Sequence, residues 1–186
     1  MIRKILRSGD PKLREISKPV TKIDSKILEL IRDLKETLAI QKDPEGVGLA
    51  APQIGKRLRI FVANYKDLNR VVINPEILET KVKKIKTNES SKTKDKQEIL
   101  EGCLSLPNYY GPLKRNQKLK IKYQTLKMVN GQWLMVDKTE SFSGFNAQII
   151  LHEIDHLNGV LFLDRLLEQK KPLYKLEKDQ WEEVDI

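Results

Sequence analysis

The sequence predicts an α+β fold, in which short antiparallel β-sheets pack around a central helix, with further helices toward the N- and C-terminal ends. Three observations predict it. Several short strand-like runs are bounded by turn signals, an amphipathic helical run comes early, and a second helical run comes late. The 186 residues suit one domain, 1–186, because a chain of this length can bury a proper core. The sequence has no internal repeat and no convincing domain linker.

The first predicted elements are a helix over 25–40 and two strands. The helix follows from apolar residues near helical spacing, namely Ile27, Leu28, Leu30, Ile31, Leu34 and Leu38. The run LRIFVA at 58–63 predicts a strand. A second strand is predicted over 70–73, and we expect Asn74-Pro75 to end it.

A lysine-rich hairpin is predicted next, as an insertion over 80–98. Its strands would be 77–86 and 98–100, and its polar tip would be 87–96. Seven lysines and three acidic residues fall within 80–98, a balance typical of a solvated loop. The end of the chain, 177–186, has the opposite balance, with five acidic residues and one lysine.

A second hairpin and the remaining helices complete the predicted fold. Alternation over 119–124 and the turn signal Asn130-Gly131 before 132–138 predict two paired strands. Ser143 can cap a helix that runs to about 157 and forms the centre of the fold. A last short helix is predicted over 164–169.

Composition indicates where in the cell the protein is expected, but it says little about the function. No apolar run approaches the roughly 20 residues that a membrane span needs. The first ten residues lack the apolar stretch and cleavage site of a secretory signal. A single cysteine excludes an intramolecular disulfide framework and fits a reducing compartment, so we expect a cytoplasmic protein. The net charge of +9 can attract RNA or acidic surfaces, but charge alone does not indicate a function.

The strongest chemical signal is the sequence HEIDH at 152–156. Residues four apart on a helix share one face, so His152 and His156 can reach one metal ion while Glu153 flanks its water. Both histidines of the chain belong to this motif. Catalytic metal sites usually have three protein ligands, and the single cysteine, Cys103 in EGCLSLP, is the candidate for the third. Thiolate and imidazole ligands suit iron(II) or zinc.

A glycine-rich segment, GVGLAAPQIG at 46–55, is the third notable motif. It lacks the lysine and the glycine spacing of a phosphate-binding loop, which argues against nucleotide binding. Its small residues would let the backbone lie close to a ligand, and Gln53 offers an amide donor. Alone, the segment is more typical of a structural turn than of a binding segment.

Together, the three motifs resemble the signature motifs of the bacterial-type peptide deformylases, in the same order and with plausible spacing. The resemblance extends over most of the chain and implies a metal-dependent hydrolase that removes the N-formyl group from the initiator methionine of nascent polypeptides, releasing formate. It implies Cys103, His152 and His156 as ligands of one divalent ion. We expect iron(II), with zinc, nickel and cobalt left open.

The resemblance also implies roles for the residues around the ion. Glu153 would be the acid/base, and the Gln53 amide and the Leu104 backbone N–H would stabilise negative charge on the formyl oxygen. The methionine pocket would be lined by Val47, Gly48, Phe145 and Ile149. For Ile149, ordinary core packing is an equal alternative. We also expect an ion pair between Glu101 and Arg115.

The chain departs from the family pattern at three positions near the site. Leu151 stands where glutamine is usual, Gln148 where arginine or an apolar residue is common, and Asn108 where glycine is common. None of these departures removes a ligand or the base, so they concern the pocket and its surroundings.

The implied partners are N-formylmethionyl peptides and, as a candidate, the ribosome near the nascent chain. We expect no membrane association and no direct DNA binding. The acidic end speaks against ribosome docking through a basic C-terminal helix, which leaves the 80–98 hairpin as a substitute.

Two other functions compete with deformylation. A zinc metallopeptidase also uses HExxH, but it would normally need a third histidine or a glutamate downstream, and the chain has no third histidine. A basic RNA- or ribosome-binding module with a structural metal is the alternative outside enzymes.

Overall fold

The computed structural model describes residues 1–42, 45–81 and 100–186. Within them the chain forms two antiparallel sheets. The larger sheet has the order β1-β2-β3-β6-β7 and the smaller one the order β4-β5-β8-β9. The strands of the larger sheet are β1 (Gly48–Ala50), β2 (Ile60–Tyr65), β3 (Leu68–Lys81), β6 (Lys118–Val129) and β7 (Gln132–Ser143). Those of the smaller sheet are β4 (Glu101–Cys103), β5 (Leu106–Gly111), β8 (Leu173–Glu177) and β9 (Gln180–Val184).

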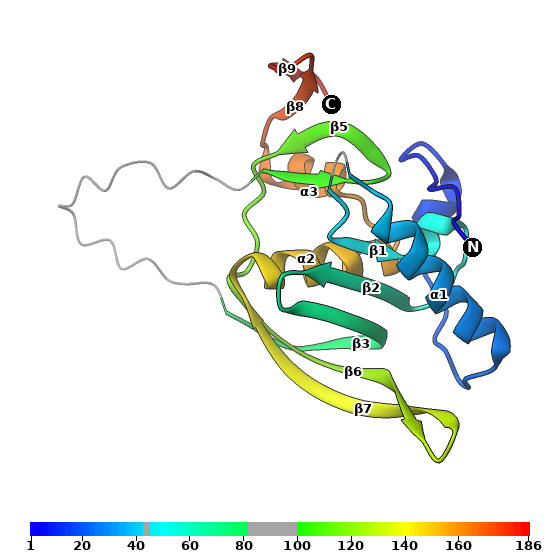
Figure 1. Ribbon diagram of the computed structural model, residues 1–186. Coiled ribbons are helices and arrows are strands. Elements are labelled where there is room, and N and C mark those ends of the chain that lie inside the picture. The colour runs from blue at the N-terminus through cyan, green and yellow to red at the C-terminus, as the bar shows by residue number, and fades with distance from the viewer. Residues whose placement is uncertain (43–44, 82–99) are drawn as a thin grey trace.

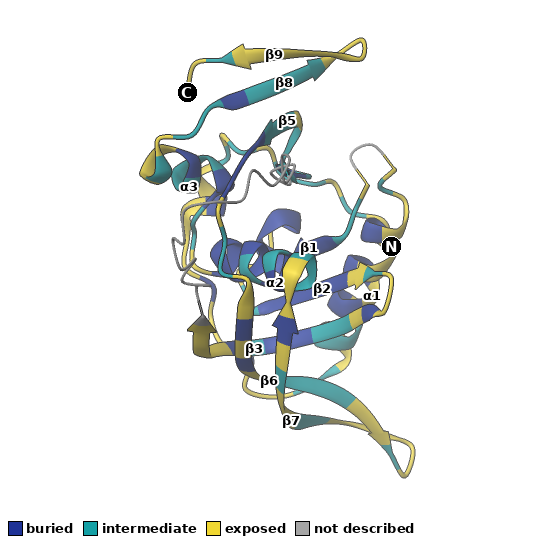
Figure 2. Ribbon diagram, turned by 90° about the vertical axis from the view of Figure 1, so that its left-hand side faces the viewer, coloured by how far each residue is buried: buried dark blue, intermediate teal, exposed yellow. Residues whose placement is uncertain are grey.

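The helices are placed around these sheets, with the second helix at the centre (Figure 1). They are α1 (Ser25–Ala39), α2 (Gly144–Leu157), α3 (Phe162–Gln169) and the 3₁₀ turns η1 (Pro11–Arg14) and η2 (Ala51–Ile54). Helix α2 lies between β2 of the larger sheet and β5 of the smaller one, and it is largely buried (Figure 2). The predicted α+β fold with antiparallel sheets around a central helix is therefore confirmed.

Strand β2 shows how the larger sheet is covered on both faces. Phe61 and Ala63 pack in one core cluster with Ile150 of α2. Ile60 and Val62, which alternate with them along the strand, pack in a second cluster with residues of α1. Successive strand residues point to opposite faces, so α1 and α2 cover opposite faces of this strand. The continuous apolar run at 58–63 is the pattern expected of a strand buried on both sides.

The predicted 119–138 hairpin is present and longer than expected. In its first strand, β6, lysines at 118, 120 and 122 are exposed and the residues between them are buried. Asn130 and Gly131 join β6 to β7 with positive φ values of 48° and 78°, which a tight hairpin turn of this kind requires. Figure 1 shows the hairpin extending away from the rest of the molecule.

The expectation that Asn74-Pro75 ends a strand is wrong. Strand β3 continues through this dipeptide, and its register against β6 shifts between Ile73 and Glu76. Asn74 has a positive φ of 50°, accepts a hydrogen bond from Val20 N and donates to Val20 O. The side chain thus satisfies the backbone of a neighbouring segment while the strand bulges.

Other predictions of the elements met mixed outcomes. The helices predicted at 25–40, 143–157 and 164–169 match α1, α2 and α3 closely. Ser143 occupies the N-cap position of α2, but its side chain makes no capping hydrogen bond. The chain does not end in a helix, because the hairpin of β8 and β9 follows α3. The tip of the predicted lysine-rich insertion and most of its return strand lie within 82–99, outside the described residues. None of the described helices is both long and apolar enough to span a bilayer.

Candidate metal centre and active site

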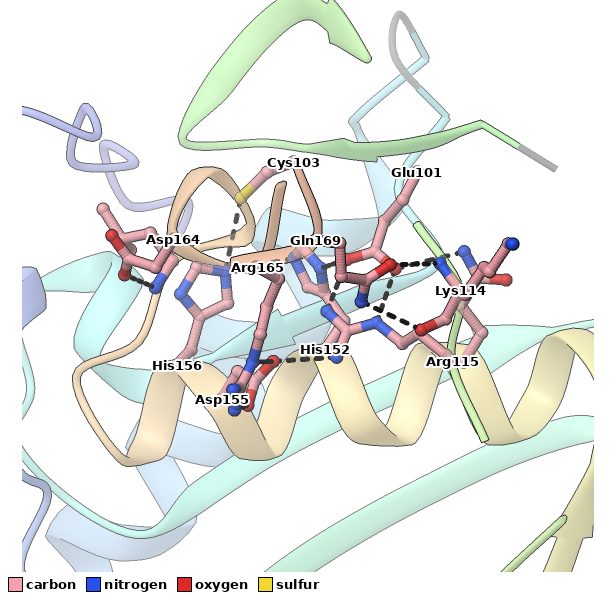
Figure 3. A network of polar contacts seen from close by, with 12 residues as sticks. Glu101, Cys103, Lys114, Arg115, His152, Asp155, His156, Asp164, Arg165 and Gln169 are labelled. Carbon is pink, nitrogen blue, oxygen red and sulfur yellow. Dashed lines mark hydrogen bonds and ion pairs between the residues drawn. The ribbon is translucent and has the colours of Figure 1, made fainter. Parts of the chain in front are cut away.

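Two histidines and a glutamate of the site come from α2, which is buried along most of its length. His152 and His156 lie four residues apart, and their Nε2 atoms are 3.1 Å from each other. Glu153 lies between them in sequence and is 3% exposed. Figure 3 shows both imidazoles extending from the helix toward the end of β4. The helical spacing thus places the two rings together, as the sequence predicts.

Cys103, the last residue of β4, lies next to the two imidazoles. Its Sγ atom lies 3.3 Å from His156 Nε2, and the register between β4 and β5 shifts just before it. Three ligand atoms, one from each of Cys103, His152 and His156, lie within 4.8 Å of one another, and all three residues are buried. A thiolate with two imidazoles is a donor set that suits zinc or iron(II).

The protonation of this cluster fits a cation bound at its centre. Burial raises the pKa of the Cys103 thiol, but the facing imidazoles of His156 and His152 lower it well below its usual range. Burial lowers the pKa of His152, whereas Glu101 and Cys103 raise it well above the ordinary value. The thiolate form of Cys103 and the protonated form of His152 are therefore both favoured, so the space between the sulfur and the imidazole nitrogens attracts positive charge. A divalent ion would replace the proton held there, because metal ligands bind in their deprotonated forms.

Glu101 holds the His152 ring from the side away from the cluster. Its Oε1 atom lies 2.7 Å from His152 Nδ1 and accepts a hydrogen bond from Arg115 Nη2 at 2.6 Å. Its Oε2 atom accepts hydrogen bonds from Arg115 Nε and Gln148 Nε2. With Nδ1 donating to Glu101, His152 presents a Nε2 lone pair to the cluster, as a metal ligand must. Burial raises the pKa of Glu101, but Arg115 and His152 reverse this and keep the carboxyl ionised.

The expected ion pair of Glu101 and Arg115 is thus present, and it continues outward. Arg115 Nη1 donates to Asp155 Oδ2 at 2.8 Å, and Asp155 in turn accepts a hydrogen bond from Arg165 of α3 at 2.6 Å. Figure 3 shows these contacts along one side of α2. The side chains of Arg115 and Asp155 are 9% and 10% exposed, so this is a buried ion-pair chain.

Glu153 is buried and lines the same pocket as Cys103 and His152. Burial raises the pKa of its carboxyl to about 7, although the two imidazoles oppose the shift. Its Oε2 atom has no hydrogen-bond partner among the described residues. A Cβ atom at Gly48 would lie 2.8 Å from Glu153 Cδ, so glycine is what allows β1 to approach this carboxylate. A group with a pKa near neutrality can both accept and return a proton.

Gln53, from η2, is oriented with its amide donor toward the cluster. Its Oε1 accepts a hydrogen bond from Ala50 N at 2.8 Å. Its Nε2 lies 3.2 Å from Ser105 Oγ and 3.7 Å from Cys103 Sγ. The backbone contact at Oε1 therefore fixes which end of the amide faces the site.

A pocket of 310 Å³ opens over these groups. Its lining includes the four residues expected to bind the methionine, namely Val47, Gly48, Phe145 and Ile149. Gln53 and Leu104 line it as well. Ile149 belongs to a core cluster as well, so its core packing is confirmed, whereas its role in binding methionine stays a prediction. Sequence reasoning missed Tyr65 and Tyr110 in the lining. Tyr65 packs edge-on against Phe145 with ring centroids 4.9 Å apart, and no local pattern marks such a partner.

The three departures from the family pattern have separate structural settings. Leu151 packs against the core cluster and does not line the pocket. Gln148 lines the pocket and donates to Glu101. Asn108 has a positive φ of 69°, a conformation that glycine and asparagine tolerate, so asparagine can stand there in place of glycine.

Comparison with known proteins agrees with this arrangement. The family model for polypeptide deformylase matches residues 2–172. The chain belongs to the polypeptide deformylase family. The peptide deformylase of Dictyoglomus thermophilum is 41% identical over 169 residues, which are 91% of this chain and 95% of that protein. The peptide deformylase of Heliobacterium modesticaldum is 39% identical over 165 residues, 89% of this chain and 94% of that protein.

Solved deformylase structures share the fold. The crystal structure of the Thermotoga maritima peptide deformylase has a TM-score of 0.68 and 37% identity, covering 89% of this chain and 97% of that one. The Synechococcus elongatus peptide deformylase in complex with actinonin has a TM-score of 0.67 and 33% identity, covering 87% and 76%. Peptide deformylases remove the N-formyl group from nascent chains. Family membership therefore favours this activity over the metallopeptidase and RNA-binding alternatives.

Proposed function

We propose that this deformylase family member removes the N-formyl group from the initiator methionine of nascent polypeptides in the cytoplasm and releases formate. One observation carries the proposal. Cys103, His152 and His156 converge within 4.8 Å, and Cys103 and His152 of this cluster line a pocket together with Glu153 and Gln53. A structural metal site would not require a carboxylate and an amide at the ligand cluster. An HExxH metallopeptidase would need a histidine or a glutamate as its third ligand, whereas the third ligand atom here is the sulfur of Cys103.

The three converging side chains would hold one divalent ion, and we infer iron(II), with zinc, nickel and cobalt as alternatives. When bound, such an ion acts as a Lewis acid that polarises the formyl carbonyl and makes water more acidic. Glu101 keeps His152 in the required tautomer and orientation, and Arg115 keeps Glu101 ionised.

Proton transfer is assigned to Glu153. Its carboxylate takes a proton from the attacking water and returns it to the amine that leaves as the new N-terminus. A pKa of about 7 suits both steps, since the group is present in both protonation states near neutral pH. The oxygen of the formyl group gains negative charge in between. Gln53 Nε2 and the Leu104 backbone N–H are the donors that we infer for it.

The methionine side chain is assigned to the apolar part of the pocket formed by Val47, Phe145 and Ile149. Strand β1 is an edge strand of the larger sheet within the described residues, and Gly48 of this strand lines the pocket. The unpaired edge can accept the backbone of an extended peptide, as edge strands do in other peptide-binding proteins.

Formate release measured on anaerobically purified protein, with metal analysis of the same sample, tests the proposal. Wild-type protein is expected to release formate from a formyl-methionyl peptide and to leave internal peptide bonds intact. Glu153→Ala should keep the metal and lose nearly all turnover, roughly 100-fold or more. Glu168→Ala, which removes an exposed carboxylate from α3, is the matched control. Peptide-bond cleavage without formate, or an active Glu153→Ala variant, would overturn the assignment.

A further inference from the structure

The chain continues beyond the part that matches the family model, and this end joins the sheet that contains Cys103. The match ends at residue 172, and β8 begins at Leu173. Strand β8 pairs with β5, and β9 pairs with β8, so the hairpin widens the smaller sheet from the site outward. Figures 1 and 2 show β8 and β9 beyond β5, at the end of the molecule where the chain terminates.

The two faces of this sheet differ in their surroundings. Tyr109, Leu173 and Val184 alternate onto one face and pack in the core cluster with residues of α3. The opposite face carries side chains that do not belong to this core cluster. Directly paired residues of antiparallel strands point to the same face. Tyr110 pairs with Tyr174, and Leu176 pairs with Trp181; Tyr174 also pairs with Glu183, so one acidic residue lies on the same face. We refer to the face that carries these four residues as the aromatic shelf: Tyr110, Tyr174, Leu176 and Trp181.

The aromatic shelf is continuous with the pocket through Tyr110. Tyr110 pairs with Gly102, and a Cβ atom at Gly102 would lie 2.8 Å from its ring. The ring therefore occupies the space that this glycine leaves, and it lines the pocket next to Leu104. On its other side Tyr110 meets Trp181 edge-on, with ring centroids 5.3 Å apart and an interplanar angle of 74°. Trp181 remains 52% exposed, which leaves much of a large apolar ring in contact with water.

We propose that the aromatic shelf binds apolar side chains of the residues that follow methionine in the formylated peptide. This proposal rests on the proposed function. A peptide longer than formyl-methionine has to leave the pocket, and Tyr110 connects one wall of the pocket to the shelf. Tyrosine and tryptophan offer large, rigid apolar area, which favours aromatic or aliphatic side chains over charged ones. Trp181 is thus a specificity-determining residue that lies outside the metal centre.

Kinetics with two peptides test the shelf. Formyl-Met-Phe-Phe is compared with formyl-Met-Ala-Ala in the metal-loaded enzyme. Trp181→Ala is expected to raise KM for the aromatic peptide roughly two- to tenfold, the loss typical of one aromatic contact. It should leave kcat for both peptides, and KM for the alanine peptide, unchanged. Trp181→Phe should restore the preference. Trp133→Ala removes the other exposed tryptophan, on β7, and should behave as wild type. An equal change for both peptides would overturn the proposal.

Fluorescence separates this proposal from the proposed function. The chain has two tryptophans, so Trp133→Phe leaves Trp181 as the single reporter. With Glu153→Ala added to prevent turnover, formyl-Met-Phe-Phe should shift the emission of Trp181 and formyl-Met-Ala-Ala should not. No shift with the aromatic peptide, or a Trp181-dependent dimer in sedimentation, would assign the shelf to another role. Absence of formate release by wild type would instead reject the proposed function, and the emission result would still decide the shelf.

Discussion

Replacing Gly48 by alanine should disturb the reaction much more than the fold. A Cβ atom at this position would lie 2.8 Å from Glu153 Cδ, whereas ordinary contacts of a Cβ begin at 3.4 Å. Glu153 Oε1 would lie closer still, so the carboxyl group would have to retreat by at least about 0.6 Å, and a misplacement of about 1 Å can cost roughly 100-fold in rate. The obstructing atoms belong to the end of a flexible side chain, so the backbone need not move. We therefore expect kcat to fall roughly 10- to 100-fold.

Three measurements on Gly48→Ala distinguish this reasoning from general damage. Formate release gives kcat, metal analysis gives occupancy, and thermal unfolding reports the fold. Metal content should be unchanged, because the three atoms nearest to the new methyl group all belong to Glu153 and not to a ligand, and the midpoint of unfolding should shift by only a few degrees. Gly9→Ala is the matched control, since a Cβ there would have no neighbour within 4 Å. Wild-type turnover in Gly48→Ala, or loss of metal along with activity, would refute the placement of Glu153.

Three further predictions concern the ligands and the ion pairs. Cys103→Ala should weaken metal binding by more than the roughly 10- to 100-fold that loss of an outer partner costs, measured by competition with a chelator; unchanged affinity would contradict its role. Arg115→Leu removes the buried arginine that Glu101 and Asp155 share and should lower the free energy of unfolding in urea by about 3–5 kcal/mol, whereas a change under about 1 kcal/mol would show that the network relaxes. A hydrogen bond from Arg70 lowers the pKa of Glu140; burial opposes this, and Tyr123 adds to it. The ionised Glu140 therefore contributes its full stabilisation of the fold above the ordinary carboxyl pKa, and this stabilisation is lost as pH falls through the lowered pKa. The difference in Tm between wild type and Glu140→Gln should hold near neutrality and shrink below about pH 4; a constant difference down to pH 3 would contradict the assignment.

The parts of the fold that could be predicted from sequence are those determined by local periodicity. Helix α1 follows from its amphipathic spacing, and the hairpin of β6 and β7 follows from alternation around Asn130-Gly131. Strand β3 was misjudged at Asn74-Pro75, because the side chain of Asn74 is satisfied by Val20, which lies far away in sequence. The strands β8 and β9 were missed for a similar reason. Their pairing with β5 is non-local, and the exposed, charged β9 has no apolar alternation that would indicate a strand.

The site, like the fold, has residues that local sequence patterns predict and contacts that only the tertiary structure reveals. His152, Glu153 and His156 could be predicted as a unit because one helical repeat fixes their relative positions before any tertiary contact is known. Cys103 required an argument from the missing third ligand, and the structure places its sulfur 3.3 Å from His156 Nε2. The contacts that tune these groups depend on pairs distant in sequence. Glu101 reaches His152 across 51 residues, and Gly48 meets Glu153 only because β1 passes along α2. A helical motif therefore specifies which chemistry is available, whereas the protonation and orientation of its members are set by strands that no local pattern connects to it.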